Sequence, residues 1–236
     1  MSSKNSDLYF RQIAVGEMAN LAYLIGSRQT REALVVDPAW NVETLLEQAA
    51  GDDMQVVGAL VTHYHQDHIG GSLFGQTIPG LQRFLEDCPS PVHAHKLEAQ
   101  GVADIAGVPR SEITAHDGGD IIELGGIRVR LIHTPGHTPG SQCFLVEEAT
   151  RPGQLVSGDT LFLGSCGRVD LPGSDPEAMY HSLNGTLKQL PDETLLFPGH
   201  LYSAEAQSTL GAEKQSNPFL RVTSLDMFLS FMGVGG

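Results

Sequence analysis

Residues 62–68, with the sequence THYHQDH, place His63, His65, Asp67 and His68 within six consecutive positions. A packed core does not require such a cluster, whereas a metal site does, because neutral imidazole and carboxylate groups are preferred ligands of zinc, iron and manganese. The preceding residues 56–61 are apolar and rich in valine, which predicts a buried strand. The candidate ligands therefore lie where a strand ends and a loop begins, the usual place for a site in an α/β protein.

The same order of strand, tight turn and ligand-type residue occurs three more times along the chain. The predicted strands cover residues 127–132, 154–156 and 194–196. The candidates that follow them, each beside a glycine in a turn, are His137, Asp159 and His200. One such arrangement could arise by chance, but four that all deliver His or Asp indicate a shared metal site.

The remaining patterns predict a mixed α/β chain in one domain over residues 1–236, with a short helical tail at about 204–236. Further strands are predicted at residues 8–15, 21–26, 33–37, 91–94, 120–124 and 142–146. Helices are predicted at residues 41–50, 79–85, 96–106, 175–190 and 225–232, with Asn41 and Asp175 as N-caps. Gly70 and Gly71 are expected to let the chain turn closely past the site. Residues 72–90 fit a pocket wall and an ordinary surface loop equally well.

The composition excludes several classes of function. With 28 acidic and 14 basic residues the net charge is −14, and no basic run is present to neutralise phosphates, which argues against a nucleic-acid partner. No segment approaches the roughly 18–20 apolar residues of a membrane span, and the first residues lack the apolar core of a signal peptide. Three widely spaced cysteines favour a reducing cytoplasm over a disulfide framework. We therefore expect a cytoplasmic protein that acts on a small molecule, and a homodimer is compatible with this expectation.

The order of these motifs resembles the metallo-β-lactamase superfamily over nearly the whole chain. The resemblance implies an α/β fold of the four-layer αββα sandwich type in a single domain, with the metal site at one edge. It also implies two divalent metal ions about 3.5–4 Å apart, with zinc preferred and iron or manganese as alternatives. The implied ligands are His63, His65 and His137 for the first metal and Asp67, His68 and His200 for the second, with Asp159 bridging both.

Three local motifs narrow the resemblance to glyoxalase II-type proteins. They are GDTLF at 158–162 with CGR at 166–168, PGH at 198–200 with Tyr202, and the segment 211–221. This subgroup contains two chemistries, namely two-metal hydrolysis of hydroxyacylglutathione thioesters and one-iron oxidation of glutathione persulfide. The HIGG sequence at 68–71 is more similar to the hydrolases, and CGRVD at 166–170 is more similar to the dioxygenases. The iron triad implied for a dioxygenase is His63, His137 and Asp159, and such enzymes also keep the other ligand positions.

The leading interpretation is a metal-dependent hydrolase acting on a thioester of the hydroxyacylglutathione type. The expected nucleophile is a metal-held hydroxide, and Asp67 is the catalytic carboxylate that orients it, so that no Ser or Cys nucleophile is required. Between His200 and Asn217 there are too few residues for the C-terminal helical domain of the longer enzymes, and no Lys or Arg follows Arg221 in this sequence. Arg168 and Tyr202 remain as expected substrate anchors. A persulfide dioxygenase, a lactonase and a β-lactamase-like hydrolase remain as alternatives.

Several other residues have weaker patterns. Asp37 ends a predicted strand and is expected either to orient a ligand histidine or to cap a turn. Cys166 fits either a place near the substrate or ordinary burial. The histidines outside the strand-turn pattern, for which we expect structural roles, are His93, His95, His116, His133 and His181.

Overall fold

Strand β2 (Asn20–Ser27) explains how the layers of this protein form, because both of its faces are buried. In the computed structural model, which describes residues 6–149 and 151–233, Tyr23 and Ile25 lie in a core between two sheets. Ala22 and Leu24 point to the opposite side, into a core beneath helices. Alternate side chains of a strand point to opposite faces, so a strand that is apolar throughout must lie between two layers.

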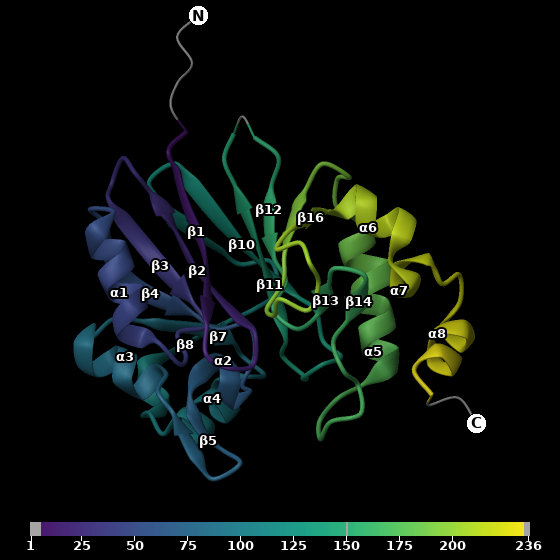
Figure 1. Ribbon diagram of the computed structural model, residues 1–236, viewed down its shortest axis with the longest axis horizontal. Coiled ribbons are helices and arrows are strands. Elements are labelled where there is room, and N and C mark those ends of the chain that lie inside the picture. Colours follow the sequence, from purple (N-terminus) through teal and green to yellow (C-terminus); the bar gives the residue numbers. More distant parts are fainter. Residues whose placement is uncertain (1–5, 150, 234–236) are drawn as a thin grey trace, which may run out of the picture.

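The described residues contain two sheets of six strands each, which face one another in the middle of the molecule (Figure 1). The first sheet has the order β1 (Leu8–Val15), β2, β3 (Glu32–Val36), β4 (Gln55–Leu60), β7 (Val92–His95) and β8 (Ile113–His116). The second has the order β16 (Ser208–Thr209), β15 (Leu195–Phe197), β12 (Gln154–Val156), β11 (Gln142–Glu147), β10 (Ile127–His133) and β9 (Ile121–Leu124). The strands expected from the sequence are therefore confirmed, with ends that differ by one or two residues.

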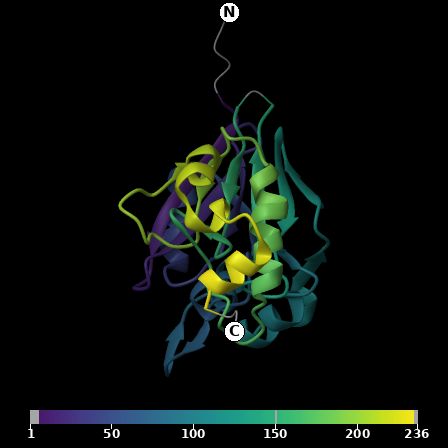
Figure 2. The ribbon, with the colours of Figure 1, turned by 90° about the vertical axis from the view of Figure 1, so that its right-hand side faces the viewer.

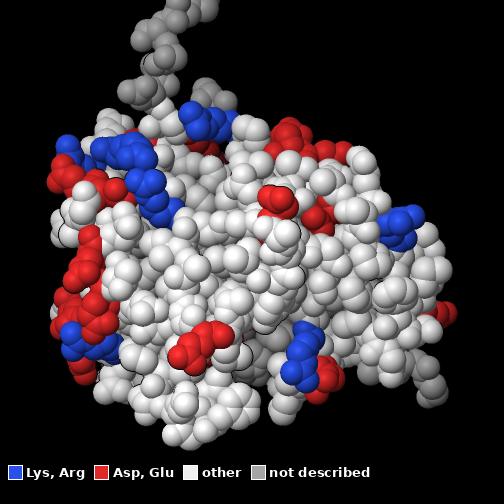
Figure 3. Space-filling model, in the orientation of Figure 1, with Lys and Arg blue, Asp and Glu red and all other residues white. Residues whose placement is uncertain are grey.

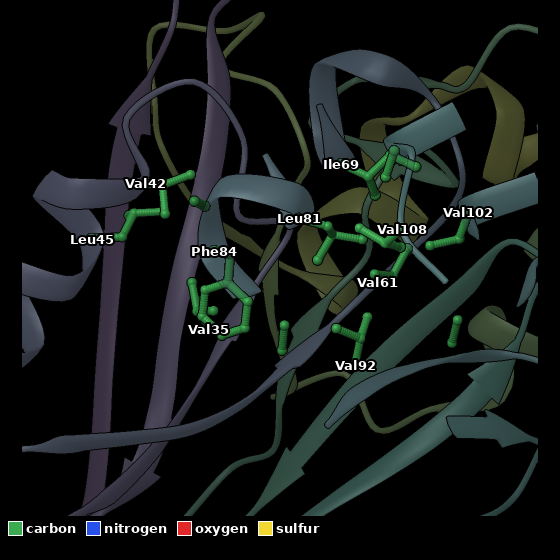
Figure 4. Packing of buried hydrophobic residues seen from close by; sticks show 14 of the residues in the cluster. Val35, Val42, Leu45, Val61, Ile69, Leu81, Phe84, Val92, Val102 and Val108 are labelled. Carbon is green, nitrogen blue, oxygen red and sulfur yellow. The ribbon is translucent and has the colours of Figure 1, made fainter. Parts of the chain in front are cut away.

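Helices cover the outer face of each sheet. The first sheet is covered by α1 (Val42–Gly51), α3 (Leu81–Asp87) and α4 (Ala99–Ala106), and Figure 4 shows Leu81 and Phe84 of α3 in the core that they share with Val35. The second sheet is covered by α5 (Pro176–Tyr180), α6 (Leu210–Ser216), α7 (Pro218–Arg221) and α8 (Leu225–Phe231), which lie in front in Figure 2. The four layers confirm the αββα sandwich expected from the sequence.

Smaller elements lie beside the sandwich. They are α2 (Gln66–Ile69), the hairpin β5 (Gly71–Leu73) and β6 (Gln76–Ile78), the hairpin β13 (Leu161–Phe162) and β14 (Ser165–Cys166), and a single turn at Arg110–Glu112. The hairpin β5–β6 occupies part of the segment 72–90 that the sequence left undefined. The helix expected at 79–85 begins two residues later, after Pro79 and Gly80.

Three local expectations need correction. Asn41 is at the N-cap position of α1, but its side chain makes no capping bond and instead accepts a hydrogen bond from the Gly16 amide at 3.0 Å. The helix that begins after Asp175 is α-helical only to Tyr180, and it continues as a π-helical turn and then a 3₁₀ turn to residue 189. The π-helical segment contains the poor helix formers Asn-Gly-Thr.

The third correction concerns the glycine pair after α2. Gly70 and Gly71 have φ of 85° and 118°, in the region that favours glycine. A Cβ atom on Gly70 would lie 2.6 Å from the Gly80 Cα, and one on Gly71 would lie 2.5 Å from the Ile105 carbonyl oxygen. The pair therefore allows close approach to α3 and α4 rather than to the candidate ligands.

Some expectations concern residues that the structure does not describe. The segment 1–5, in which we found no signal-peptide pattern, and the end of the predicted tail, 234–236, both lie outside the described residues. Across the described ranges, no helix is long and apolar enough to cross a bilayer. Within the same ranges Cys88, Cys143 and Cys166 are free thiols.

Candidate metal centre

All seven candidate ligands meet at one edge of the sandwich because the strands that precede them point the same way. β3 and β4 are parallel, as are β12 and β15, so that their carboxyl ends lie together. Gly158 and Gly199 permit this convergence. A Cβ on Gly158 would lie 2.7 Å from the Thr62 Cβ, and one on Gly199 would lie 2.5 Å from Asp159 Oδ1. A side chain on Gly158 would push against the loop after β4 of the other sheet, and one on Gly199 would displace Asp159 within the same sheet.

A buried carboxylate, Asp37, orients two of the histidines. Its Oδ2 lies 3.0 Å from Nδ1 of His68 and accepts a hydrogen bond from the Thr62 hydroxyl at 2.6 Å. Because that hydroxyl gives its proton to Asp37, it accepts from Nδ1 of His63 at 3.0 Å. Both imidazoles therefore carry a proton on Nδ1 and turn their Nε2 atoms inward. Of the two roles expected for Asp37, the orientation of a histidine is the one its contacts support.

Backbone carbonyls orient two further histidines in the same way. Nδ1 of His137 donates to the Arg168 carbonyl at 2.8 Å, and Nδ1 of His200 donates to the Met18 carbonyl at 2.9 Å. The Nε2 atom of His137 lies 3.0 Å from Nδ1 of His65, and the Nε2 atoms of His200 and His68 lie 3.1 Å apart. Ring nitrogens of four histidines thus converge in pairs at the centre.

The carboxylate of Asp67 is held from outside the cluster. Asn20 Nδ2 donates to Asp67 Oδ2 at 3.0 Å, and Trp40 Nε1 donates to the Asp67 carbonyl at 3.0 Å. The same Oδ2 lies 3.4 Å from His200 Nε2. Asp67 therefore presents an oriented oxygen to the centre even though it sits on a helix of only one turn.

The donor atoms form three groups, in each of which every atom lies within 4.8 Å of the others. The groups are His63, His65 and His137; His63, His68 and Asp159; and Asp67, His68 and His200. Among the described residues, His63 Nε2 and Asp159 Oδ1 are buried side-chain atoms without a hydrogen-bond partner. Buried polar atoms are costly to leave unpaired, and a mixed nitrogen and oxygen donor set suits zinc, iron or manganese. The residues present therefore fit a pair of metal ions.

Burial and charge divide the histidines into two classes. Burial, with the neighbouring imidazoles, holds the pKa of His63 well below its usual range and lowers the pKa of His65 to about 4. Burial also acts to lower the pKa of His68, but the carboxylates of Asp67 and Asp159 outweigh it and raise that pKa to about 9. The same carboxylates raise the pKa of His200 to about 10. The centre is thus an anionic pocket that attracts positive charge, as a cation site requires.

The two expected substrate anchors lie at the edge of the centre. The Arg168 guanidinium is exposed and pairs with Asp170 through two hydrogen bonds of 2.9 Å, so that its charge is already balanced. The Tyr202 ring stacks on His200, with ring centroids 4.8 Å apart and planes 9° from parallel. Tyr202 is 63 % exposed, so part of its side chain can contact a ligand.

The remaining histidines lie away from this cluster, in agreement with the structural roles expected for them. His93 contacts His116 at 2.9 Å, and His95 stacks on His133 with centroids 3.9 Å apart. His181 lies 3.9 Å from Glu177 on the outer face. Cys166 is buried, and burial raises the pKa of its thiol to about 12, which favours the structural interpretation of this cysteine.

The sequence analysis did not identify four residues that support the candidate ligands. The Met18 carbonyl comes from the turn between β1 and β2, Asn20 is the first residue of β2, and Trp40 comes from the loop before α1. No spacing relates these positions to the ligand motifs. Thr62 could have been found, because it directly precedes His63 and a hydroxyl there can reach the imidazole Nδ1.

The fold and this cluster define the class of protein. Residues 15–200 match the model of the metallo-beta-lactamase superfamily, and the chain belongs to that family. Membership makes the chain a metal-dependent hydrolase or a related enzyme, and the His and Asp cluster is of the kind that holds two metal ions.

Relatives of both chemistries are similar to this chain. Hydroxyacylglutathione hydrolase GloC of Haemophilus influenzae is 30% identical over 199 residues, covering 82% of this chain and 90% of that protein. The human mitochondrial persulfide dioxygenase ETHE1 is 29% identical over 228 residues, covering 96% of this chain and 81% of that protein. The crystal structure of TTHA1623 in a di-iron-bound form superposes with a TM-score of 0.69 at 31% identity, covering 89% of this chain and 100% of that chain. These relatives support the glyoxalase II-like subgroup.

Proposed function

We propose that this protein is a two-metal hydrolase that cleaves the C–S bond of a thioester. The observation that carries the proposal is the convergence of Asp67, His68 and His200 into a second buried donor group beside the group of His63, His65 and His137. Asp159 would contact both metals, since its two oxygens lie 3.4 Å from His68 Nε2 and 3.6 Å from His137 Nε2 respectively. The hydroxyacylglutathione hydrolase relative and the di-iron relative support this proposal.

Two bound metal ions would supply a hydroxide nucleophile at neutral pH and would stabilise negative charge on the carbonyl oxygen. The chain itself would orient the attacking water through Asp67, whose Oδ2 is fixed by Asn20. Asp37 and Thr62 would hold the Nδ1 protons of His68 and His63, so that the inward Nε2 atoms would be the ones to bind the metal ions. Cys166 would not act as a nucleophile, since a thiol with a pKa of about 12 stays protonated at neutral pH.

The second candidate is a one-iron persulfide dioxygenase, which the human relative and the segment 166–170 favour. In that case His63, His137 and Asp159 would hold the iron. Two histidines and one carboxylate on one side of the iron would leave its other coordination positions open to substrates. His65 and His68 would then not contact the metal.

Metal content and reaction product separate the two candidates. A His68→Ala variant of a two-metal hydrolase should fall from about two metal ions per chain to about one and lose hydrolysis of thioesters. The same variant of a dioxygenase should keep one iron, and the iron-loaded wild type should consume oxygen when given glutathione persulfide. Rapid oxygen uptake with release of sulfite would refute the hydrolase proposal.

A further inference from the structure

A hollow of about 400 Å³ lies directly beside the candidate metal centre, where it includes His65 and Asp67 in its lining. The apolar part of its lining comes from Met18, Leu73, Phe74, Ile105, Leu171 and Pro172. These residues belong to separate parts of the chain, namely the β1–β2 turn, the β5–β6 hairpin, α4 and the loop after β14. The fold therefore gathers apolar side chains from four places at the mouth of the site.

The hairpin tip carries an aromatic residue that folding does not require. Phe74 is 94 % exposed, and its φ of 50° lies in the left-handed region, where Asn or Gly is the usual residue. Exposed apolar side chains in a group beside a cleft commonly mark a binding surface. Met18, which lines the same hollow, is also exposed, at 38 %. The hairpin has no charged residue from Gly71 to Ile78, and the lower end of the molecule, where β5 is labelled in Figure 1, is largely white in Figure 3.

The charge of the hollow limits what it can bind. In the lining, as far as the structure describes it, Lys and Arg are absent, and the only carboxylate is the candidate ligand Asp67. Arg168, the cation expected to anchor a substrate, is paired with Asp170. A substrate with carboxylates, such as a glutathione conjugate, would lose hydration here without gaining a partner charge. An uncharged apolar group would instead gain from leaving water.

We propose that this hollow holds the apolar acyl chain of an uncharged thioester, with Phe74 covering part of the chain. This assignment rests on the thioester hydrolysis proposed above. Hydrolysis would break the C–S bond and form a C–O bond, with water supplying the hydroxyl of the carboxylic acid and the proton of the released neutral thiol. Phe74 is then a residue that determines specificity, and it selects substrates by the length of the acyl chain.

The test uses the zinc-loaded full-length protein and acetyl and octanoyl thioesters of N-acetylcysteamine. Ketone analogues, in which a methylene replaces the sulfur, allow binding to be measured by calorimetry without turnover. The octanoyl ketone should bind at least about tenfold more tightly than the acetyl ketone, because each added methylene leaves water. The ratio should fall at least about fivefold in Phe74→Asn, since Asn tolerates the left-handed backbone and removes only the apolar surface.

The matched control is Phe231→Asn, which replaces another exposed phenylalanine, on α8, outside the hollow. It should leave the ratio unchanged. Equal binding of both ketones, or tighter binding of the corresponding glutathione ketone, would overturn the assignment. Hydrolysis of both thioesters at equal kcat/KM, without any binding preference, would keep the hydrolase and reject the acyl site. A strong binding preference without hydrolysis of either thioester would keep the acyl site and reject the hydrolase.

Discussion

Asp37→Asn tests the idea that a buried carboxylate sets the protonation of the metal-binding face. Asp37 has a φ of 51°, and Asn is among the few residues that accept this backbone conformation, so the substitution changes chemistry with little strain. The Asn Oδ1 atom can still accept from the Thr62 amide, as the Asp37 Oδ1 atom does at 2.8 Å. The Asn Nδ2 group would then face the Thr62 hydroxyl and His68 Nδ1, and it can only donate.

Both partners must respond to this new donor. His68 would have to accept on Nδ1 and move its proton to Nε2, and the Thr62 hydroxyl would turn to donate to Nδ1 of His63, with the same result. Two inward nitrogens would then carry protons where a metal needs lone pairs. Loss of one hydrogen bond to a charged group costs about 1.5–3 kcal/mol. Removal of the hydrogen-bond partner of a ligand histidine lowers metal affinity by about 10–100-fold. Since about 1.4 kcal/mol corresponds to a tenfold change in the dissociation constant, the two estimates agree.

The assay is the zinc dissociation constant, measured by competition with a chromogenic chelator at constant pH. We expect it to rise about 10–100-fold in Asp37→Asn. Asp52→Asn is the control, because Asp52 is also a hydrogen-bonded carboxylate but pairs with Arg11 and Tyr9 away from the centre. An affinity within twofold of the wild type in Asp37→Asn would refute the role assigned to Asp37.

Three further predictions follow from the geometry. His65→Ala should lower metal content and abolish thioester hydrolysis, as measured by elemental analysis and a thiol-release assay; full activity in this variant would contradict the two-metal scheme. Removal of zinc by a chelator should lower Tm by about 5–10 °C in calorimetry, because a ligand at about 100 times its Kd stabilises the folded state by about 2.7 kcal/mol, and an unchanged Tm would argue against a metal held by folded residues only. Hydrogen bonds from Arg11 and Tyr9 hold the pKa of Asp52 well below its usual range, so this carboxylate stabilises the folded state above the unfolded pKa of about 3.9 and loses its effect as the pH falls further. The difference in Tm between the wild type and Asp52→Asn should therefore be present at pH 7 and shrink below about pH 4, and a constant difference would count against this coupling.

The sequence was sufficient for the features that depend on local order. The runs before His63, His137, Asp159 and His200 form β4, β10, β12 and β15, and these strands bring their ligand candidates to one edge. The reason is physical, because parallel strands place their carboxyl ends together whatever loops connect them. This rule accounts for the candidates that follow strands of one sheet, whereas the meeting of His63 with those of the second sheet also requires the packing of the two sheets.

Features that depend on contact between distant segments could not be read in this way. Asn20 and Trp40 support Asp67 across 47 and 27 residues, and no periodicity connects them. The β5–β6 hairpin has strands of only three residues, too short to give a recognisable alternation. Asn41 illustrates another limit of sequence analysis. It does lie at the N-cap of α1, as predicted, but its side chain bonds to Gly16 instead of capping the helix.

The distribution of the donor atoms along the chain has a consequence for unfolding. His65 and His137 meet across 72 residues, and His68 and His200 meet across 132. An ion held by both members of such pairs closes long loops between the two halves of the molecule, as a reversible cross-link would. Closing a loop of this length restricts an unfolded chain strongly, and the entropic cost rises only slowly with further length. Each group of donors draws on both halves of the sandwich, so a complete group forms only when the two sheets have joined, and release of the ion and separation of the sheets should be coupled.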